Sequence, residues 1–317
     1  MLNRRQLRIK VMQALYGFFQ SGEDSIQTAE NKLFHSIDRI YDLYLLQFAL
    51  LSEIHKESLK DREIGKEKFF PTEEEKMETT PFTENPFFKL IDESEELQKS
   101  LERKKLSWAN NEEAATNVFK KLKTSAAYKE YINTSETSFD KDIDFITRFY
   151  KKFICDEELL VSFYEEQNIH WNDDIDLVNY LFIKTLKDLR HNKPLQLKSL
   201  YKDQADDMDF IKTLFRKTII RNEELESYIT DNTKNWEAER IALMDLILMK
   251  MAICELLEFP SIPVKVSLNE YIEISKSFST PKSSNFINGI LDKVVVVLKN
   301  KNLLKKSGRG LVDNSNK

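Results

Sequence analysis

The chain has 317 residues, of which 41% are hydrophobic and 32% are charged, and its formal net charge is −5. This content of hydrophobic residues is enough for a sizeable buried core, and the length allows one large domain or two ordinary ones. Six glycines and seven prolines leave little material for the tight turns of an all-β fold and favour long helices. The composition therefore predicts an all-α protein.

Charge is distributed unevenly along the chain. Residues 1–22 contain four basic residues and no acidic residue, and residues 233–317 contain thirteen basic and nine acidic residues. The remaining residues, 23–232, carry a net charge of −13. Salt screens electrostatic attraction beyond about 8–10 Å, so nearby charges decide which ligands a surface attracts. The basic ends can therefore offer a polyanion site although the whole chain is acidic.

The first predicted helix covers about residues 4–21, with Asn3 as a candidate N-cap. Apolar residues recur along it at the spacing of one buried stripe. At 100° per residue, Arg5 and Arg8 lie beside this stripe, on the flank that also carries Tyr16. The helix thus has either a basic, ligand-binding edge that ends in an aromatic side chain or an ordinary solvated start.

An acidic, helical region follows over residues 23–205. A second helix is predicted over 26–60, and the acidic residues and prolines over about 61–86 predict an exposed linker. Shorter helical patterns come next, and their aromatic residues recur at helical spacing, which favours core packing over stacking on bases. These aromatic residues are Phe119, Phe145, Phe149, Tyr150, Phe153, Phe163, Trp171, Tyr180 and Phe182.

Residues 206–317 include the most apolar helix of the chain and end in a basic tail. Ala238–Leu257 is apolar on nearly every helical face, which predicts a central helix surrounded by its own protein. Ser267 and Glu270 have the spacing of a capping box for the next helix. Gly289 lies inside the last predicted helix, where glycine costs up to about 1 kcal/mol relative to alanine. We therefore expect another backbone to approach closely at Gly289.

Motifs for catalysis, cofactor binding and metal binding are missing from the sequence. The glycines do not form a phosphate-binding loop, and the four histidines lack the spacing of metal ligands. Cys155 and Cys254 are isolated on apolar segments, which is typical of small core residues. We find no apolar stretch long enough to cross a bilayer and no secretory signal at the start. We therefore expect a cytoplasmic protein without enzymatic activity, cofactor, metal or membrane contact.

Several short motifs keep their order and spacing across the two ends of the chain. They are Arg4-Arg5-Gln-Leu-Arg8 with Gln13-Ala-Leu-Tyr16, Asn235-Trp236 with Glu239-Arg240-Ile241, and Phe286-Ile-Asn288-Gly289-Ile-Leu291-Asp292-Lys293. Over about 1–22 and 206–317 the chain thereby resembles the NusB family of bacterial transcription antitermination factors. That family has an all-helical fold of two small bundles, so the resemblance implies a NusB-like fold with residues 23–205 as an additional acidic helical insertion.

The resemblance implies a non-enzymatic, RNA-binding role. Members of the family pair with NusE, a ribosomal protein of the small subunit, and together they bind single-stranded boxA RNA in the transcription elongation complex, notably on ribosomal RNA operons. Arg4, Arg5 and Arg8 correspond to the arginine-rich start of the family, which contacts RNA, and Gln13 and Tyr16 follow on the same helix. Guanidinium and aromatic groups suit single-stranded RNA because they bind phosphates and stack on unpaired bases.

Two charged residues of the central helix also correspond to family positions. Lys250 stands where the family often has a basic residue, which makes it a further candidate for RNA contact. Asp245 matches an acidic position, and both a buried ion pair and an RNA contact remain open for it.

The resemblance places the protein partner on the last two helices. Phe278 and Phe286 are candidates for apolar contact with the partner, with core packing as the alternative, and Lys282 and Asn288 belong to the same region. Other members often carry an acidic residue in the loop where this chain has Lys282. That difference concerns the polar part of the partner contact.

The acidic insertion has no counterpart in the short members of the family. Its negative charge disfavours RNA, so we expect it to make protein contacts. One alternative function is therefore a protein-interaction scaffold in ribosome assembly, with incidental RNA binding. Another is an RNA methyltransferase, because a similar helical domain occurs in such enzymes, but the missing glycine-rich loop and cysteine motif disfavour it.

Overall fold

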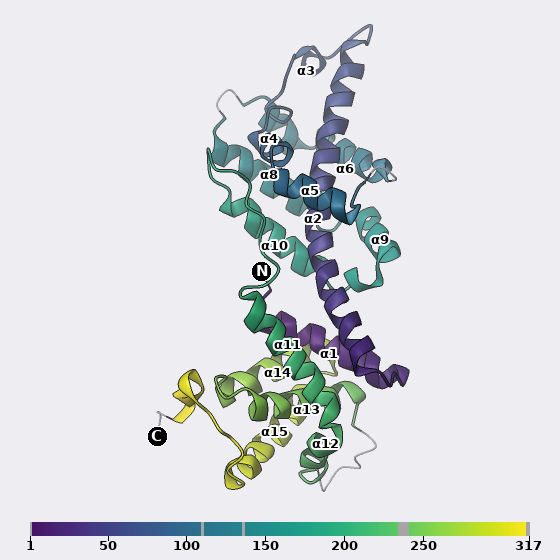
Figure 1. Ribbon diagram of the computed structural model, residues 1–317. Coiled ribbons are helices and arrows are strands. Elements are labelled where there is room, and N and C mark those ends of the chain that lie inside the picture. The colour runs from purple at the N-terminus through teal and green to yellow at the C-terminus, as the bar shows by residue number, and fades with distance from the viewer. Residues whose placement is uncertain (1, 109–110, 135–136, 234–240, 315–317) are drawn as a thin grey trace. The chain divides into compact units, whose positions relative to one another are not determined.

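The computed structural model describes residues 2–108, 111–134, 137–233 and 241–314. Every regular element among these residues is an α-helix or a 3-10 helix, which confirms the predicted all-α class (Figure 1). The chain forms two compact units. We call Met1–Ile37 with Tyr201–Lys317 the terminal unit, and Asp38–Leu200 the inserted unit. The terminal unit thus includes residues 23–37, which the sequence pattern grouped with the insertion.

The terminal unit is made of helices from both ends of the chain. Its first part holds α1 and the beginning of α2, which continues into the inserted unit, and the remaining helices follow residue 201. The elements are α1 (Arg4–Ser21), α2 (Ile26–Lys66), α11 (Gln204–Ile220), α12 (Asn222–Thr230), α13 (Leu243–Glu258), α14 (Val264–Phe278), α15 (Ser283–Asn300) and η3 (Gly308–Asn314).

Helix α1 begins and ends with local capping signals. The Asn3 side chain accepts a hydrogen bond from the Gln6 backbone N–H, and the Gln6 side chain accepts one from the Asn3 N–H. This reciprocal capping box confirms Asn3 as the N-cap. At the other end, Gly22 has a φ of 66°, the left-handed conformation that glycine adopts without strain. The predicted extent of 4–21 is confirmed.

Helix α13 is the centre of the terminal unit, as its hydrophobicity predicted. It packs against α1, α11, α12, α14 and α15 (Figure 1). All its residues from Ile247 to Leu256 are buried. Asn235, Trp236, Glu239 and Arg240, together with the first residues of the predicted central helix, lie outside the described residues.

Two predictions for the last helices are wrong. Helix α14 begins three residues before Ser267, with Pro263 at its N-cap, so Ser267 and Glu270 do not form a capping box. Ser267 is instead a fully buried residue inside the helix. At Gly289, an added Cβ would meet no described atom within 4 Å, so a close backbone approach does not explain this glycine.

The inserted unit consists of the rest of α2 and a series of shorter helices. Short loops that contain caps such as Asn85, Ser94, Ser125 and Ser138 connect several of them. The helices are α3 (Glu73–Lys76), α4 (Pro86–Asp92), α5 (Glu95–Lys104), α6 (Glu112–Thr124), α7 (Ala126–Ile132), α8 (Phe139–Phe153), α9 (Glu158–Gln167), η1 (Ile169–Trp171) and α10 (Ile175–Asp188).

Aromatic side chains form much of the core of the inserted unit. Phe82 is fully buried and makes ring contacts with Phe88, Tyr128, Phe145 and Phe149. Its position differs from the expectation of an exposed segment over 61–86, because the turn before α4 packs into the core. The core prediction is confirmed for six of the nine aromatic residues: Phe119, Phe145, Phe149, Tyr150, Trp171 and Phe182.

Three of the nine aromatic residues are less enclosed. Phe153 and Phe163 are half-buried. For Tyr180 the core prediction is wrong, because this residue is 61% exposed. Tyr180 and the buried Phe182 are two positions apart on α10, so their side chains face different sides of the helix. The two residues could not both belong to one buried face.

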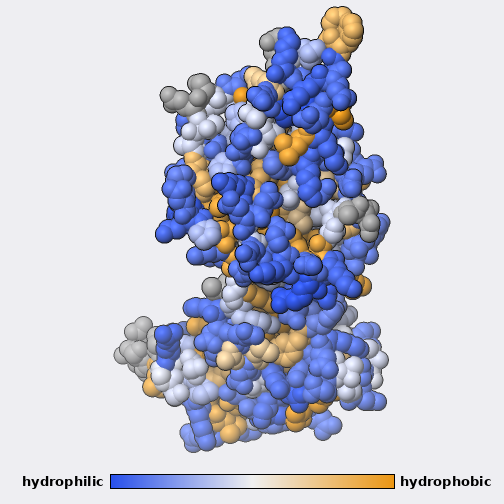
Figure 2. All heavy atoms as spheres, turned by 45° about the horizontal axis from the view of Figure 1, so that its top comes forward, coloured by the Kyte–Doolittle hydropathy of each residue, from blue (hydrophilic) through white to orange (hydrophobic). Residues whose placement is uncertain are grey.

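The turn between α2 and α3 exposes two adjacent phenylalanines. Phe69 and Phe70 are 90% and 86% exposed, and their rings contact each other edge to face at 5.0 Å. In the space-filling view this turn forms a hydrophobic knob among hydrophilic side chains (Figure 2). Such exposure of large apolar side chains is a common mark of an interaction site.

Candidate functional site

Three arginines project from the first two turns of α1, and each has a carboxylate partner far away in the sequence. The Asn3 cap sets the beginning of the helix, and therefore the directions in which Arg4, Arg5 and Arg8 point. The side chains are 46% exposed for Arg5, 31% for Arg4 and 2% for Arg8. The Arg4 and Arg5 side chains are therefore partly exposed and Arg8 is not, although Arg4 Nη1 itself is buried.

Arg8 and Glu255 form a buried ion pair. The Nε and Nη2 atoms of Arg8 each donate to one Glu255 oxygen over 2.7 Å, and the Glu255 side chain is fully buried. Ser267 Oγ donates to the same carboxylate at 2.7 Å and Tyr271 Oη at 3.0 Å. Burial alone would lower the pKa of Arg8, but the hydrogen bond and charge of Glu255 outweigh it and raise that pKa above its ordinary value. Arg8 stays charged and joins α1 to α13 and α14.

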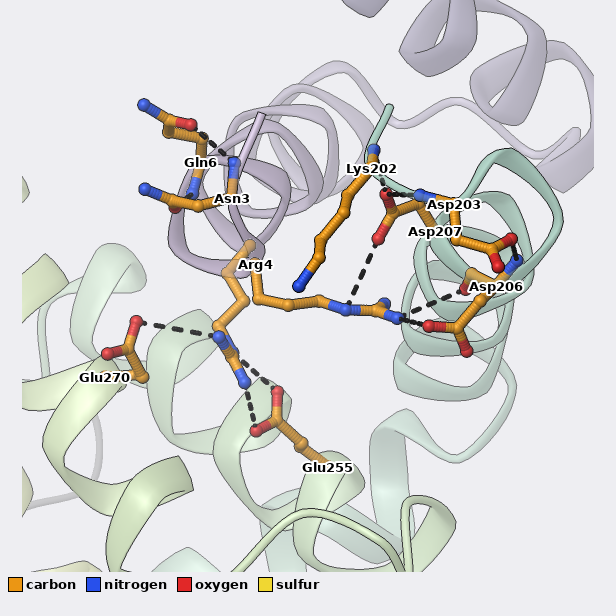
Figure 3. Close-up of polar contacts among 10 residues, drawn as sticks. Asn3, Arg4, Gln6, Lys202, Asp203, Asp206, Asp207, Glu255 and Glu270 are labelled. Carbon is orange, nitrogen blue, oxygen red and sulfur yellow. Dashed lines mark hydrogen bonds and ion pairs between the residues drawn. The ribbon is translucent and has the colours of Figure 1, made fainter. Parts of the chain in front are cut away.

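Arg4 lies between two aspartates of α11 (Figure 3). Its Nη2 pairs with Asp206, and its Nε lies 3.4 Å from Asp207 Oδ1. The guanidinium carbon is 4.2 Å from the centre of the Phe210 ring, which is within the range of a cation–π interaction. Arg4 is therefore held in place while about a third of its side chain remains accessible.

Arg5 pairs with Glu270 on α14. Its Nε and Nη2 donate to the two carboxylate oxygens of Glu270 over 2.9 and 2.8 Å, and this hydrogen-bonded contact raises the pKa of Arg5. Glu270 Oε2 is also 3.6 Å from Arg8 Nη1, so one carboxylate serves two arginines. An ion pair with this exposure contributes about 0–1 kcal/mol, and an incoming phosphate can replace Glu270 as the partner of Arg5.

The three arginines line a groove with a volume of about 1140 Å³. The rest of its lining comes from Asn3, the first turns of α11, the loop between α13 and α14, the first two turns of α14 and the C-terminal tail. It includes three carboxylates, those of Asp206, Asp209 and Glu270. An apolar part of the lining lies beside the guanidinium groups and consists of Phe210, Phe259, Pro260, Ile262, Pro263 and Val266. The groove thus offers cations for phosphates and apolar surface for bases within one site.

Gln13 and Tyr16 lie further along α1, outside the described lining of this groove. Tyr16 is 39% exposed and Gln13 is half-buried. Of the residues on α1 that the sequence suggested for RNA binding, the structure brings the three arginines together at the groove and leaves these two on a neighbouring stretch of the helix.

Lys250 is enclosed within the terminal unit. Its Nζ donates to Asn222 Oδ1 at 2.6 Å and to Glu226 Oε2 at 2.7 Å, and it lies 5.5 Å from the centre of the Phe19 ring. Only 5% of the Lys250 side chain is exposed. This arrangement joins α13 to α12 and leaves little of the ammonium group for an external ligand.

Asp245 anchors the loop between α14 and α15. Its two carboxylate oxygens accept hydrogen bonds from Ser279 Oγ and Ser283 Oγ. Asp245 is buried, and its hydrogen-bond partners among the described residues are these hydroxyl groups. Of the two roles left open for Asp245, the structural one fits this geometry, with hydroxyl groups in place of a cation.

Of the four candidate residues for partner binding, Phe278 and Lys282 lie at the two ends of this loop, and Phe286 and Asn288 lie in the first two turns of α15. Lys282 and Asn288 are exposed, and the Asn288 side chain donates to Asp292 at 3.3 Å. Phe278 and Phe286 are half-buried, so each contributes to the core and also presents apolar atoms at the surface.

Reactive groups are sparse in the described part of the chain. It contains no cluster of three or more His, Cys, Asp or Glu side chains that could hold a metal ion. Cys155 and Cys254 are free, and burial raises the pKa of their thiols to about 11 and about 12, which keeps both thiols protonated and poorly nucleophilic. No helix in the described segments is long and apolar enough to cross a membrane.

The described elements of the terminal unit form an all-helical domain with a buried arginine–glutamate pair and an arginine-lined surface groove. Residues 177–296 match the model of the NusB family, and the chain thus contains a NusB-family domain, as the sequence motifs indicated. The match includes α11–α14 and α15 up to residue 296, and it extends back into α10. Residues 1–22, with the three arginines, lie outside it.

Curated relatives match about a third of the chain. The transcription antitermination protein NusB of Salinibacter ruber is 45% identical over 104 residues, which are 33% of this chain and 65% of that protein. The protein of the same name from Chloroherpeton thalassium is 47% identical over 105 residues, 33% of this chain and 50% of that protein. The one from Natranaerobius thermophilus is 41% identical over 85 residues, 27% and 61% of the two chains. No solved structure matches.

Proposed function

We propose that the chain is a non-enzymatic, RNA-binding transcription antitermination factor. It acts in the cytoplasm, in the transcription elongation complex, where it binds boxA-type single-stranded RNA together with NusE and supports transcription of ribosomal RNA. The names of its relatives support this role. The observation that carries the proposal is the groove, where two partly exposed arginines lie beside apolar side chains.

Within this proposal the candidate RNA residues have different tasks. Arg5 contacts a phosphate, because its side chain is the most accessible of the three and Glu270 can be displaced. Arg4 contacts a phosphate on its exposed side, where its partner Asp206 is 74% exposed. Tyr16 and Gln13 extend the RNA path along α1 by stacking and hydrogen bonding. Arg8 acts indirectly, because it is buried and fixes α1 against α13 and α14. Lys250 is buried between α13 and α12 and does not contact RNA in this proposal.

Fluorescence anisotropy with labelled boxA RNA tests the proposal over a series of salt concentrations, with and without NusE. We expect Arg5→Ala to weaken binding and to flatten the plot of log affinity against log salt by about 0.7, the value for one phosphate contact with a single strand. Lys276→Ala is the matched control, because Lys276 is an exposed cation of the terminal unit outside the groove lining. Equal affinities and slopes for wild type and Arg5→Ala would refute the role of Arg5.

We propose that NusE contacts the surface formed by Phe278, Lys282, Phe286 and Asn288. Titration calorimetry with purified NusE tests this with Lys282→Glu, which changes the charge of the loop without touching the core, and with Lys276→Glu as the control. If the loop contacts NusE, the first substitution changes the affinity for NusE and the second does not. Identical affinities for both variants would place the polar contact elsewhere.

A protein-interaction scaffold in ribosome assembly is the second candidate function, and the exposed Phe69–Phe70 pair favours it. In that case Phe69→Ser with Phe70→Ser abolishes binding to precursors of the small ribosomal subunit and leaves RNA affinity intact. Leu59→Ser, at a 43% exposed position of the same unit, is the control. If the double variant keeps precursor binding, the knob is not the scaffold surface.

A further inference from the structure

The C-terminal tail folds back onto the loop between α13 and α14. Lys306 Nζ donates to the Phe259 carbonyl and the Ser307 N–H donates to the Pro260 carbonyl, both at 3.0 Å. Gly310 is buried against the same loop, and an added Cβ would lie 2.0 Å from the Pro260 carbonyl oxygen. This close packing requires glycine at position 310, so the tail binds the loop in one defined position. We call the contact of Gly310 with Pro260 the seat of the tail.

This seat places Arg309 in the lining of the groove. Arg309 is exposed and has no ion pair or hydrogen bond with any residue that the structure describes. The arginines of α1 differ in this respect, because Arg4, Arg5 and Arg8 all have carboxylate partners. An anion that enters the groove can therefore bind Arg309 without first displacing a carboxylate.

The surface next to Arg309 favours a nucleic acid over other anions. Pro260 and Val266 of the same lining are exposed, and Phe259 stands against Phe210 with a distance of 4.9 Å between ring centres. Apolar and aromatic surfaces beside a cation suit a chain that alternates phosphates with flat bases. An acidic peptide would use the cation but gain little from this apolar surface.

We propose that Arg309 is a phosphate-binding residue of the RNA groove, and that the seat of Gly310 on Pro260 holds it there. The inference rests on the proposed RNA-binding function and extends it to the tail. Arg309 lies beyond residue 296, where the family match ends, so this contact belongs to a part of the chain outside the matched domain.

The test uses the full chain and a short, labelled, single-stranded boxA-type RNA in an anisotropy titration over a series of salt concentrations. We expect Arg309→Gln to weaken binding about threefold to tenfold at low salt and to flatten the salt dependence by about 0.7. Lys305→Gln is the matched control, because Lys305 is an exposed cation on the same tail outside the groove lining. We expect its affinity to match that of wild type.

Gly310→Val tests the seat separately. The added side chain collides with the Pro260 carbonyl, so the tail must move while the arginine is kept, and we expect RNA affinity to fall as in Arg309→Gln. Since residues 301–311 follow the last core helix, circular dichroism and thermal unfolding should remain those of wild type. Competition by a short polyglutamate peptide, which we expect to be weak, probes the kind of anion that the groove prefers.

The outcomes separate this inference from the proposed function. If Arg309→Gln and Gly310→Val bind like wild type while Arg5→Ala loses affinity, the tail is not part of the site and the RNA-binding function stands. Equal losses of RNA affinity for Arg309→Gln and Lys305→Gln would show that the tail acts only through its overall positive charge, and this would overturn the inference. Polyglutamate that competes as well as RNA would overturn the assignment to nucleic acid. Failure of the wild type to bind RNA, with or without NusE, would overturn the function itself.

Discussion

Replacement of Arg8 by alanine is expected to destabilise the terminal unit strongly. The substitution leaves the Glu255 carboxylate fully buried, with the hydroxyl groups of Ser267 and Tyr271 as its neutral partners. Removal of one member of a buried ion pair costs about 3–5 kcal/mol, because the other charge stays in a medium of low polarity without its partner. We expect the free energy of unfolding of the terminal unit to fall by an amount in that range.

Two further variants show whether this loss comes from the unpaired charge. Arg8→Met with Glu255→Gln removes both charges and keeps an acceptor for one hydroxyl, so we expect it to recover at least about 2 kcal/mol relative to Arg8→Ala. Arg5 is on the same helix as Arg8 but is partly exposed, so Arg5→Ala should lower the free energy of unfolding by less than about 1 kcal/mol. The contrast follows from exposures of 2% for Arg8 and 46% for Arg5.

The assay must report on the terminal unit by itself, because the chain has two units and its unfolding need not be a single transition. Hydrogen exchange of the α13 amides in low concentrations of urea gives the local free energy of opening. A loss below about 1 kcal/mol for Arg8→Ala would refute the structural role of this pair. So would a double variant as unstable as the single one, since the cost would then come from lost packing.

Three further predictions concern other parts of the chain. Lys250→Met should change the free energy of unfolding in urea by less than about 1 kcal/mol, because its partner Glu226 is 43% exposed and regains water. The same variant should leave RNA affinity unchanged in anisotropy titrations, and a tenfold loss would show that the ammonium group contacts RNA. Burial lowers the pKa of His55, whose Nε2 is 2.9 Å from the Thr83 carbonyl oxygen. The neutral imidazole therefore stabilises the fold above the unfolded pKa of about 6.5, and this contribution is lost as the pH falls. Below that pH, wild type should lose more stability in urea unfolding than His55→Gln, and parallel curves of stability against pH would exclude this role. Asn3→Ala should cost about 1 kcal/mol through loss of the cap, measured by exchange of the first α1 amides, and no change there would contradict the capping role.

Local signals in the sequence were sufficient for most of the helices. The Asn3 cap and the end of α1 near Gly22 depend on residues a few positions apart, and both were predicted correctly. The buried character of α13 followed from its composition. Ser267 and Glu270 show the limit of such signals, because the same spacing fits a cap and an interior turn. Pro263, four residues earlier, had already started the helix.

The pairing of the arginines could not be predicted, because it joins residues that are distant in the sequence. Asp206, Glu255 and Glu270 are 202, 247 and 265 residues away from their partners Arg4, Arg8 and Arg5. One signal was present: a charged residue on an almost wholly apolar helix, such as Glu255 on α13, is rarely buried without a partner of opposite charge. The partner of Glu255 can be identified only from the three-dimensional packing of the helices.

The arginines of α1 lie in different environments, so one short motif contains both a buried residue that stabilises the fold and accessible residues that can bind a ligand. In the proposed RNA complex, a phosphate at Arg5 would have to release Glu270, which costs about 0–1 kcal/mol for a pair with this exposure. A charge-assisted hydrogen bond to that phosphate would contribute about 1.5–3 kcal/mol. The exchange is therefore favourable at Arg5. At Arg8 the same exchange would strand a buried Glu255 at a cost of about 3–5 kcal/mol, which a phosphate contact does not offset. In the proposed function, the accessible arginines of this motif bind RNA, while the buried Arg8 fixes α1 against α13 and α14.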